Sequence, residues 1–377
     1  MYLLMKIYFF IFILYLLFAT NTYAEVKITD YRDYKISKTI LQLEEISKDL
    51  NYPWGMTFID NETLIITEKK GNIYKVNTNT KKKEIIDHDL NIIAIGQGGL
   101  LDVLYYDNYL YFSYSHKIDK KFSSTAIARG NLINNQIKNL EVIFISEPKI
   151  KYSDVHFGSR LTIQNNYLFA SIGERGKGMI AQDPTKHPGS IIRINIDGSI
   201  PKDNPKFQGK SDWLPEIYQI GIRNPQGLTL SPFDKKIYMS NHGARGGDWF
   251  GEAKKGENYG WKILGWGGTN YSGIPIGPKW KPGFTKAIHY WVPSIATSAI
   301  TIYKGKEFEE WNGHALITSL KDQSLRKLIF NDLSNVKEDI VFKDKIGRIR
   351  DIQIHPNNGK VYFLAGDSLW IMEKNKK

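Results

Sequence analysis

Short runs in which apolar and polar residues alternate recur along most of the chain. Each run is rich in β-branched and aromatic residues, and a polar turn leads to a second run of the same kind. Period-two alternation, broken by Gly, Asn and Asp, predicts antiparallel strands joined by tight turns. Six of these strand–turn–strand units occur, and they begin at Gly55, Leu100, Arg160, Gly227, Ala299 and Asp351.

Six units spaced by roughly 45 to 70 residues predict an all-β protein, a six-bladed β-propeller with about four antiparallel strands in each blade. A β-sandwich seldom repeats one unit six times, and a β-helix has much shorter coils. A chain of 377 residues would ordinarily suggest two domains. The repeat instead predicts that residues 25–377 form one ring and a single domain.

The two ends of the chain supply the strands that would close this ring. An open ring would leave strand edges unpaired. Residues 38–46, KTILQLEEI, have the pattern of a strand before the first unit, and residues 368–373, SLWIME, have that of a strand after the last. We expect these two strands to pair and complete the last blade.

The first 24 residues have the three-part pattern of a secretory signal peptide. Lys6 is the only charged residue, an apolar run covers 7–19, and small and polar residues lead to an expected cleavage site after Ala24. A membrane anchor is the alternative, but this run is too short to cross about 30 Å of hydrocarbon at about 1.5 Å per residue. The pattern predicts a periplasmic or secreted protein that is not integral to the membrane after cleavage.

Composition narrows the class of partner. The chain has no cysteine, so disulfides and thiolate metal sites are excluded. A net charge of +12 is typical of proteins that bind nucleic acids. The cations are spread along the chain, however, and an exported protein rarely meets nucleic acid. We interpret the charge as a solvated basic surface that favours anionic ligands, and expect no nucleic-acid partner.

Two long connections rich in Gly, Pro and aromatic residues, 173–190 and 246–284, separate the later units. Loops held by a rigid scaffold commonly carry function, and a propeller gathers them around its axis. Several polar groups also lie where units begin or end. They comprise Gln97, His156, Glu174, Arg223, Asn224, residues 242–248, Lys321, Arg348 and Arg350.

Each of these groups alone has an ordinary structural explanation. Together they comprise an imidazole that can accept a proton, a carboxylate that can orient it, and cations that can hold a polyanion. That set suits removal of an alcohol proton while a bound cofactor accepts a hydride. The sequence contains no Gly-x-Gly-x-x-Gly after a strand, no Gly-x-Ser-x-Gly elbow and no His-Glu-x-x-His zinc helix.

A series of motifs in chain order resembles the soluble pyrroloquinoline-quinone-dependent glucose/sorbosone dehydrogenases, which include the periplasmic aldose sugar dehydrogenases. The resemblance covers nearly all of residues 25–377, and the family fold is a six-bladed propeller. It implies an aldose substrate and an external electron acceptor, either a quinone or a cytochrome. The motifs are NYPWGMTFI, GQGGLLDV, HFGSRLTI, AQDPTKHPGSIIRINIDGSIPKDNP, GIRNPQGL, GENYGW, WVPSIATSAITIY and GRIRDIQI.

The resemblance also implies residue roles. His156 corresponds to the base that takes the proton from the anomeric hydroxyl while hydride moves to the quinone, and Glu174 to the acid that orients it. Arg223 would stabilise charge developing on the quinone oxygen. Arginine forks suit a cofactor with three carboxylates. The positions matching cofactor contacts are Gln97, Arg223, Asn224, Lys321, Arg348 and Arg350.

The family also binds calcium, partly through backbone carbonyls, and the corresponding residues are Gly243 and Ala244 in the loop HGARGGDWF. The chain departs from the family in and around this loop. Proline is usual where Ala244 stands, and an acid and an asparagine where Trp249 and Gly251 stand; these changes soften the loop and remove a candidate ligand. Ile222 replaces a common histidine, and Val292 occupies a site that is aromatic in some members.

Two other functions remain open from the sequence. One is a propeller lactonase with calcium on the axis, but such enzymes need axial carboxylates, whereas cations and amides predominate near the expected axis. The other is a non-catalytic propeller that binds carbohydrate, with exposed tryptophans as the platform. Those tryptophans serve equally well to pack the long connection; they are Trp249, Trp261 and Trp266.

Overall fold

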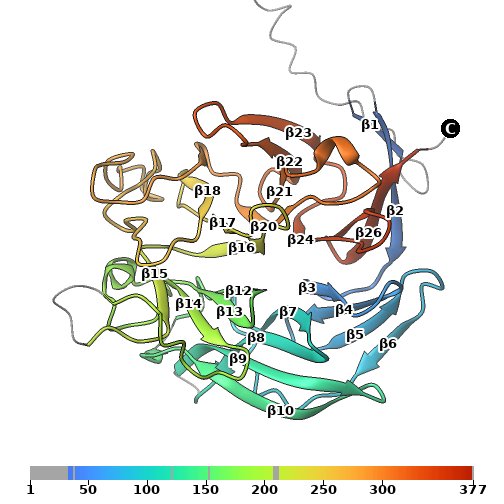
Figure 1. The fold of residues 1–377 in the computed structure, drawn as a ribbon, viewed down its shortest axis with the longest axis horizontal. Helices are drawn as coiled ribbons and strands as arrows, with labels where there is room; N and C mark the ends of the chain where they lie inside the picture. Colours follow the sequence, from blue (N-terminus) through green and yellow to red (C-terminus); the bar gives the residue numbers. More distant parts are fainter. Residues whose placement is uncertain (1–32, 37–38, 120–121, 152, 207–211, 376–377) are drawn as a thin grey trace, which may run out of the picture.

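The computed structural model describes residues 33–36, 39–119, 122–151, 153–206 and 212–375. Its strands form six antiparallel sheets arranged radially around a central axis, which confirms the predicted six-bladed β-propeller (Figure 1). The proposed signal peptide, residues 1–24, lies outside the described residues. In the part of the chain that is described, no helix is both long and apolar enough to cross a membrane.

The first three blades follow one another along the chain. Blade 1 consists of β3 (Pro53–Phe58), β4 (Thr63–Glu68), β5 (Ile73–Asn77) and β6 (Lys83–Ile86). Blade 2 consists of β7 (Leu100–Tyr106), β8 (Tyr109–Lys117), β9 (Phe122–Ile133) and β10 (Gln136–Ile145), with β11 (Ile150–Lys151) also paired to β9. Blade 3 consists of β12 (Gly158–Gln164), β13 (Tyr167–Ile172), β14 (Ser190–Asn195) and β15 (Ile217–Ile220).

The last three blades complete the ring. Blade 4 consists of β16 (Pro225–Leu230), β17 (Ile237–Asn241), β18 (Asp248–Glu252) and β19 (His289–Trp291). Blade 5 consists of β20 (Thr297–Ile302), β21 (Ala315–Ser319), β22 (Ser324–Ile329) and β23 (Lys337–Lys343). Blade 6 consists of β24 (Ile349–Ile354), β25 (Val361–Ala365), β26 (Ser368–Lys374), β2 (Thr39–Ser47) and β1 (Asp33–Ile36).

The ring closes as the sequence predicts. Strand β2 pairs antiparallel with β26 in blade 6, so the N-terminal strand completes the blade that the C-terminal strands begin (Figure 1). Leu43 lies opposite Met372 in this pairing, and both side chains are fully buried. Main-chain hydrogen bonds and apolar burial therefore join the two ends of the chain and remove two exposed strand edges.

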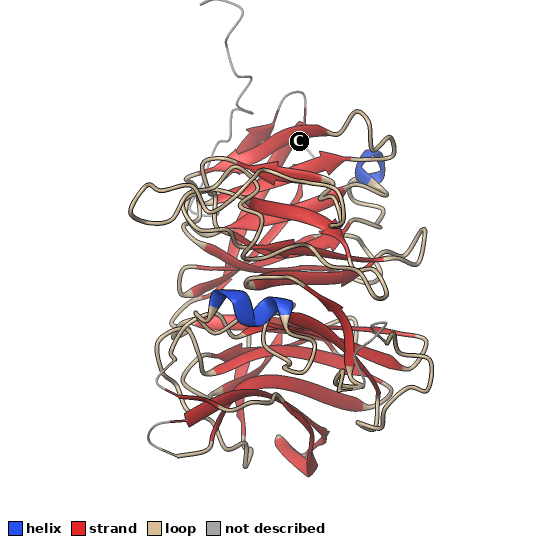
Figure 2. Ribbon diagram, turned by 90° about the vertical axis from the view of Figure 1, so that its left-hand side faces the viewer, coloured by secondary structure: helices blue, strands red, loops and turns tan. Residues whose placement is uncertain are grey.

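Both faces of the middle strands are buried, because each blade packs between two others. All five residues of β21 and of β25 are buried, and the apolar clusters of the core run from one blade into the next. Burying one Leu, Ile or Phe side chain contributes about 1.5–3 kcal/mol. Helix is confined, within the described residues, to two short 3₁₀ segments, η1 (Gly178–Gln182) and η2 (Glu309–Trp311) (Figure 2).

An ion cluster on the inner strands adds two carboxylates to the cations and amides expected near the axis. Arg160 on β12 forms ion pairs with Asp102 on β7 (2.9 Å) and Asp351 on β24 (2.8 Å), and all three side chains are buried. Its remaining guanidinium nitrogens donate to the carbonyl oxygens of Gln226 and Arg350. One side chain thus links four blades.

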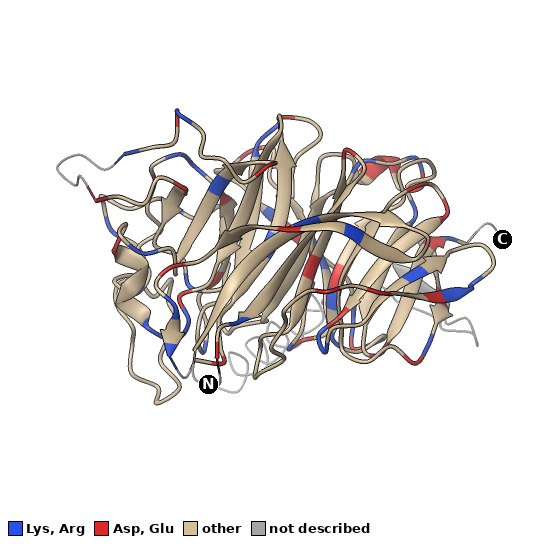
Figure 3. Ribbon diagram, turned by 90° about the horizontal axis from the view of Figure 1, so that it is seen from below, with Lys and Arg blue, Asp and Glu red and all other residues tan. Residues whose placement is uncertain are grey.

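The three tryptophans considered as a sugar platform are buried, so they pack the long connection between β18 and β19. Trp249 stacks on Tyr259 with ring centroids 4.1 Å apart, and Trp266 lies 6.4 Å from Trp249. Trp261 is 8% exposed. Seen from below, lysine and arginine positions are scattered over several strands and loops and interspersed with acidic ones (Figure 3).

Candidate active site

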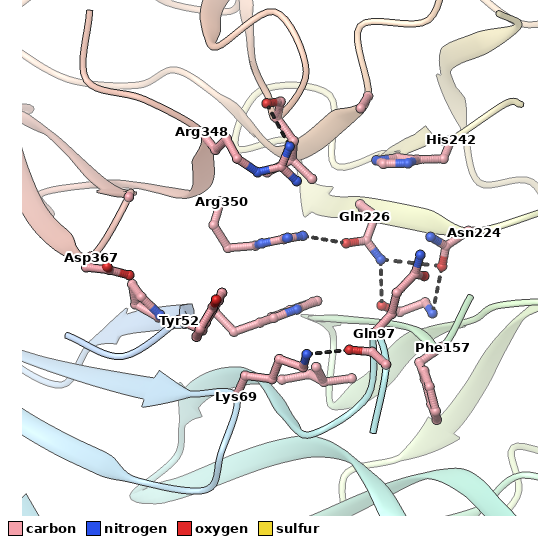
Figure 4. Close-up of a pocket in the computed structure, with 18 residues that line it drawn as sticks. Tyr52, Lys69, Gln97, Phe157, Asn224, Gln226, His242, Arg348, Arg350 and Asp367 are labelled. Carbon is pink, nitrogen blue, oxygen red and sulfur yellow. Dashed lines mark hydrogen bonds between the residues drawn. The ribbon is translucent and has the colours of Figure 1, made fainter. Parts of the chain in front are cut away.

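A cavity of about 460 Å³ lies at the end of the axis where the inner strands begin. Each blade contributes lining residues at or just before the start of its inner strand, which is where the sequence placed most of the candidate groups. Pockets of this size accommodate small organic ligands. The lining includes Tyr52, Trp54, Lys69, Gln97, Phe157, Gly158, Asn224, Gln226, His242, Ala296, Leu320, Arg348, Arg350 and Asp367 (Figure 4).

His156 and Glu174 form a hydrogen-bonded pair beside this cavity. In the register of β12 and β13, Gly158 pairs with Ile172, so residues two positions beyond each strand end lie opposite each other. Nδ1 of His156 lies 2.5 Å from Oε1 of Glu174. The side chains are 13% and 2% exposed. The sequence-predicted imidazole and carboxylate are therefore brought into direct contact.

The electrostatic surroundings favour a neutral imidazole next to a charged carboxylate. Burial lowers the pKa of His156 below 6.5, and the charges of Arg223 and Arg175 lower it further, against the opposing effect of Glu174. For Glu174, burial acts to raise the pKa, but the hydrogen bonds from His156 and from the Gly178 backbone N–H outweigh it and lower the pKa. The imidazole is thus able to accept a proton near neutral pH.

The backbone around His156 is held by amide side chains from the cavity wall. His156 has a φ of 51°, a left-handed conformation that costs a non-glycine residue energy. Its N–H donates to Oε1 of Gln97 (2.8 Å), and the N–H of Gly158 donates to Oδ1 of Asn224 (3.0 Å). These two predicted residues therefore fix the segment that carries the imidazole, as well as lining the cavity.

Three cations line the cavity. Nη1 of Arg350 donates to Oε1 of Gln226 (3.0 Å), Nη1 of Arg348 donates to the carbonyl oxygen of Leu320 (3.3 Å), and the Lys69 amine donates to the carbonyl oxygen of Gly96 (Figure 4). Burial lowers the pKa of Arg350 to about 9, and the charges of Arg160 and Arg348 add to the effect. Burial and the charge of Arg350 also lower the pKa of Lys69.

Arg223 lies close to His156 and contacts the start of the loop 242–248. Its carbonyl oxygen accepts from the Glu174 N–H (2.8 Å), and its guanidinium carbon lies 5.3 Å from the centre of the Trp261 ring. The guanidinium makes one long hydrogen bond, 3.5 Å to the His242 carbonyl oxygen. Arg223 and Lys321 are both outside the cavity lining, and Lys321 is in addition exposed.

None of the five predicted or newly found cations of the site forms an ion pair with any carboxylate in the described residues. Arg223 is buried, Lys69 and Arg350 are half-buried, and the other two are exposed. Cations without counter-ions around a cavity favour binding of an anionic ligand. The cavity chemistry therefore fits a compact polyanion whose carboxylates are met by guanidinium forks and amide groups. The cations are Lys69, Arg223, Lys321, Arg348 and Arg350.

The loop 242–248 is held by a buried carboxylate. Oδ1 of Asp248 accepts from the Gly243 N–H (2.7 Å), and Oδ2 accepts from Ser294 Oγ (2.7 Å) and the Ala296 N–H (2.7 Å). Burial lowers the pKa of His242 to about 4, and its Nε2 has no hydrogen-bond partner among the described residues. His242 is therefore a neutral imidazole in the cavity wall.

The calcium ligands predicted from the sequence are the carbonyl oxygens of Gly243 and Ala244. Within the described residues, the carbonyl oxygens of Gly243 and Ala244 accept no hydrogen bond, so both remain able to bind a hard cation. Asp248 is already satisfied by three donors, and no cluster of three or more His, Asp or Glu side chains suited to a metal occurs in the described part of the chain. The loop fits a cation held by backbone oxygens and offers it no side-chain cluster.

Several cavity residues were not among the sequence candidates. Lys69 follows β4 in a KK pair that has the pattern of a surface turn, and Trp54 and Gln226 lie within inner strands. Their signal was positional: each lies within three residues of a boundary of a blade strand near the axis. Arg160, Asp102 and Asp351 also lie two residues inside the starts of β12, β7 and β24, but the sequence does not show that they pair with one another across three blades.

The comparisons with known proteins agree with this geometry. The family model of glucose/sorbosone dehydrogenases matches residues 50–369. The chain belongs to this family. An aldose sugar dehydrogenase of Escherichia coli K12, YliI, is 32% identical over 341 residues, which cover 87% of this chain and 91% of that protein.

Two further similarities extend over most of the ring. Quinoprotein glucose dehydrogenase B of Acinetobacter calcoaceticus is 26% identical, over 93% of this chain and 90% of that protein. The crystal structure of the soluble aldose sugar dehydrogenase from Escherichia coli has a TM-score of 0.83 at 31% identity, covering 89% of this chain and all of that one. The resemblance drawn from the motifs is confirmed at the level of the glucose/sorbosone dehydrogenase family and its propeller fold.

Proposed function

We propose that the protein is an exported quinoprotein dehydrogenase that oxidises the anomeric C1 hydroxyl of aldose sugars to lactones, with pyrroloquinoline quinone as cofactor. The observation that carries the proposal is the His156–Glu174 pair at the edge of a cation-lined cavity. Family membership and the names of the two relatives, an aldose sugar dehydrogenase and a quinoprotein glucose dehydrogenase, support the same reaction.

His156 is the base in this proposal. Glu174 accepts a hydrogen bond from Nδ1–H, which leaves the Nε2 lone pair free to take the proton of the C1 hydroxyl. The depressed pKa of His156 keeps the ring neutral before reaction, and the negative charge of Glu174 stabilises the imidazolium that forms. Removal of the hydroxyl proton makes departure of the C1 hydride favourable.

Pyrroloquinoline quinone supplies, when bound, the electrophilic carbon that accepts the C1 hydride. Lys69, Arg348 and Arg350 would hold its three carboxylates, and Gln97, Asn224 and Gln226 would hold its remaining polar edge. Lys321 lies outside the cavity lining and would act at longer range. Arg223 would stabilise negative charge as the hydride is transferred. Two electrons and two protons then leave to an external acceptor, a quinone or a cytochrome, and to solvent.

We also propose that Gly243 and Ala244 bind Ca²⁺ through their carbonyl oxygens, where the cation would act as a Lewis acid beside the cofactor. The two unengaged carbonyl oxygens support the site, and the absence of a side-chain cluster in the described residues predicts modest affinity. Residues 1–24 would direct export, and the mature chain would act in the periplasm or outside the cell.

The test is reconstitution of the purified protein. Protein freed of cofactor is mixed with pyrroloquinoline quinone and Ca²⁺, and reduction of an artificial dye is followed with a panel of aldoses. We expect reduction that depends on both quinone and sugar, and that disappears in His156→Ala while cofactor binding remains. Hydrolysis of a lactone without quinone would assign the protein to the lactonases, and sugar binding without dye reduction would assign it a non-catalytic role.

A further inference from the structure

Three side chains near the His156–Glu174 pair have donor groups that the described residues engage weakly or not at all. Two of them, Arg223 and Trp261, are buried, and the third, Lys262, is exposed. Arg223 is 5% exposed and makes one long hydrogen bond, of 3.5 Å. Nε1 of Trp261, in a side chain that is 8% exposed, has no hydrogen-bond partner among the described residues. The amine of Lys262 likewise forms no ion pair or hydrogen bond with them. Unsatisfied buried donors are costly unless a ligand supplies acceptors.

Lys262 lies next to the backbone group that holds the carboxylate of the catalytic pair. Its side chain lies over Gly178, where a Cβ atom would be 3.0 Å from Cδ and 4.0 Å from Nζ of the lysine. The Gly178 N–H is the group that holds Oε2 of Glu174, whose other oxygen binds His156. Trp261 is fixed by its N–H to the Gly221 carbonyl oxygen and by its own carbonyl oxygen to Gln182. The exposed amine therefore has a defined place beside the base.

Negative charge near Lys262 is scarce. Between residues 174 and 183 the carboxylates are Glu174, bound to His156, and Asp183, bound to Thr185 and Lys186. No acidic residue occurs from 258 to 306. The rim does carry two exposed acids, Asp154 and Asp367, on the side of blades 1 to 3 and of blade 6.

The site has more cations than the three carboxylates of the cofactor would neutralise. Three carboxylates would be matched by Lys69, Arg348 and Arg350, which line the cavity together. Arg223 and Lys262 would keep their charge next to the reacting sugar. Such a local positive potential raises the concentration and the affinity of negatively charged substrates.

We propose that the favoured substrates are aldoses that carry an anionic group away from C1, and that Lys262 binds this group. This inference rests on the proposed dehydrogenase function. With C1 held at His156, the opposite end of the sugar would reach Lys262, whose exposed side chain lies over Gly178. The carboxylate of a uronic acid and the phosphate of a sugar phosphate share the required chemistry, and neutral aldoses lack it.

The experiment compares three substrates that share the glucose ring: D-glucose, D-glucuronate and D-glucose 6-phosphate. We measure kcat/KM for reconstituted wild type, for Lys262→Gln and for Lys281→Gln, a control at an exposed lysine of the same connection. We expect wild type to prefer an anionic sugar over glucose. Lys262→Gln should raise KM for that sugar by about fivefold, with kcat and the glucose reaction unchanged. The faster of the two anionic sugars identifies the group as carboxylate or phosphate.

A binding measurement separates recognition from turnover. Calorimetric titration of the cofactor-loaded His156→Ala variant with D-glucuronate and D-glucose should show tighter binding of the charged sugar, with a difference that shrinks as salt screens the charge. Equal kcat/KM for glucose and both anionic sugars, or a Lys262→Gln variant that slows all three alike, would overturn the inference and leave the dehydrogenase function intact. Absence of dye reduction with every sugar would instead contradict the proposed function.

Discussion

His156 and Glu174 are separated by a complete strand–turn–strand unit, yet Nδ1 of the histidine lies 2.5 Å from Oε1 of the glutamate. The antiparallel register of β12 and β13 accounts for this, because both residues lie two positions beyond the Gly158–Ile172 pair. The contact sets the tautomer of the ring, with the proton on Nδ1 and the lone pair on Nε2. The orientation of the proposed base therefore follows from strand pairing.

Replacing Glu174 by glutamine should impair the chemical step and spare cofactor binding. Glutamine has one acceptor oxygen and so cannot accept from both the His156 Nδ1–H and the Gly178 N–H, and an amide does not stabilise an imidazolium as a carboxylate does. We expect kcat of the reconstituted enzyme to fall by at least about 100-fold, as for the orienting acid of a catalytic triad. Tryptophan quenching by pyrroloquinoline quinone should give an unchanged Kd. A kcat within threefold of wild type would contradict an orienting role for Glu174.

The loss of activity at acidic pH should reflect protonation of His156. Only the neutral ring accepts a proton, so activity is lost as the pH falls through the pKa of His156, which burial, Arg223 and Arg175 place below 6.5. Arg223→Gln removes one lowering charge and should move this pKa upward, whereas Glu174→Gln removes a raising group and should move it downward. NMR titration of the imidazole in cofactor-free protein checks both directions, with the His156 signal assigned by its loss in His156→Ala.

The blade pattern was predictable because each inner strand is short, alternating and bounded by turn residues. The predicted units begin at Gly55, Leu100 and Arg160, and the corresponding strands β3, β7 and β12 begin within two residues of these positions. The pairing of β2 with β26 was predictable for a similar reason, since a ring with unpaired edges is unfavourable. Local pattern and closure together determine most of the fold.

Contacts across the axis were not predictable in the same way. Lys69 has the sequence environment of a surface turn, and only the ring brings it beside Arg350. Asp102 and Asp351 have the pattern of ordinary strand acids, and their pairing with Arg160 depends on the relative rotation of three blades. The placement of Lys262 over Gly178 depends on the path of a long connection that has no periodic pattern.

Arg350→Gln should weaken cofactor binding more than any change at the outer surface. The guanidinium is half-buried in the cavity without a carboxylate partner, and its pKa, lowered to about 9, reflects a charge that a bound carboxylate would stabilise. Removing one partner of a desolvated charge pair typically costs about 2–5 kcal/mol, which corresponds to a Kd raised by about 30-fold or more. Fluorescence titration with pyrroloquinoline quinone measures this Kd. Arg129→Gln, on the outer part of blade 2, is the control and should leave the Kd unchanged.

The axial ion cluster should make stability depend on pH. Burial raises the pKa of Asp351 to about 7, and the neighbouring Asp102 adds to the effect while Arg160 opposes it. A raised pKa in the folded state stabilises the protein at low pH, and this stabilisation is lost as the pH rises through the interval from about 4 to 7. Asp351→Asn replaces the titrating carboxyl with an amide, so the variant should not lose stability in this way as the pH rises.

Urea unfolding at pH 4.5 and pH 7.5 checks this prediction. The free energy of unfolding of Asp351→Asn relative to wild type should shift in favour of the variant by at least about 1 kcal/mol between the two pH values. The difference between the two proteins cancels the effects of other titrating groups. A difference that is the same at both pH values would show that Asp351 is ionised throughout.

Ring closure by β2 should be essential for stability. Leu43 is fully buried opposite Met372, so Leu43→Ala should cost about 2–5 kcal/mol in the free energy of unfolding, measured by urea denaturation with tryptophan fluorescence. Glu44→Ala, on the opposite face of the same strand, removes a partly exposed ion pair with Lys81 and should cost less than about 1 kcal/mol. Deleting residues 25–47 removes β1 and β2 and exposes the edge of β26. We expect the shortened chain to lose its cooperative transition, and an unchanged melting temperature would mean that the other strands hold the ring together without β2.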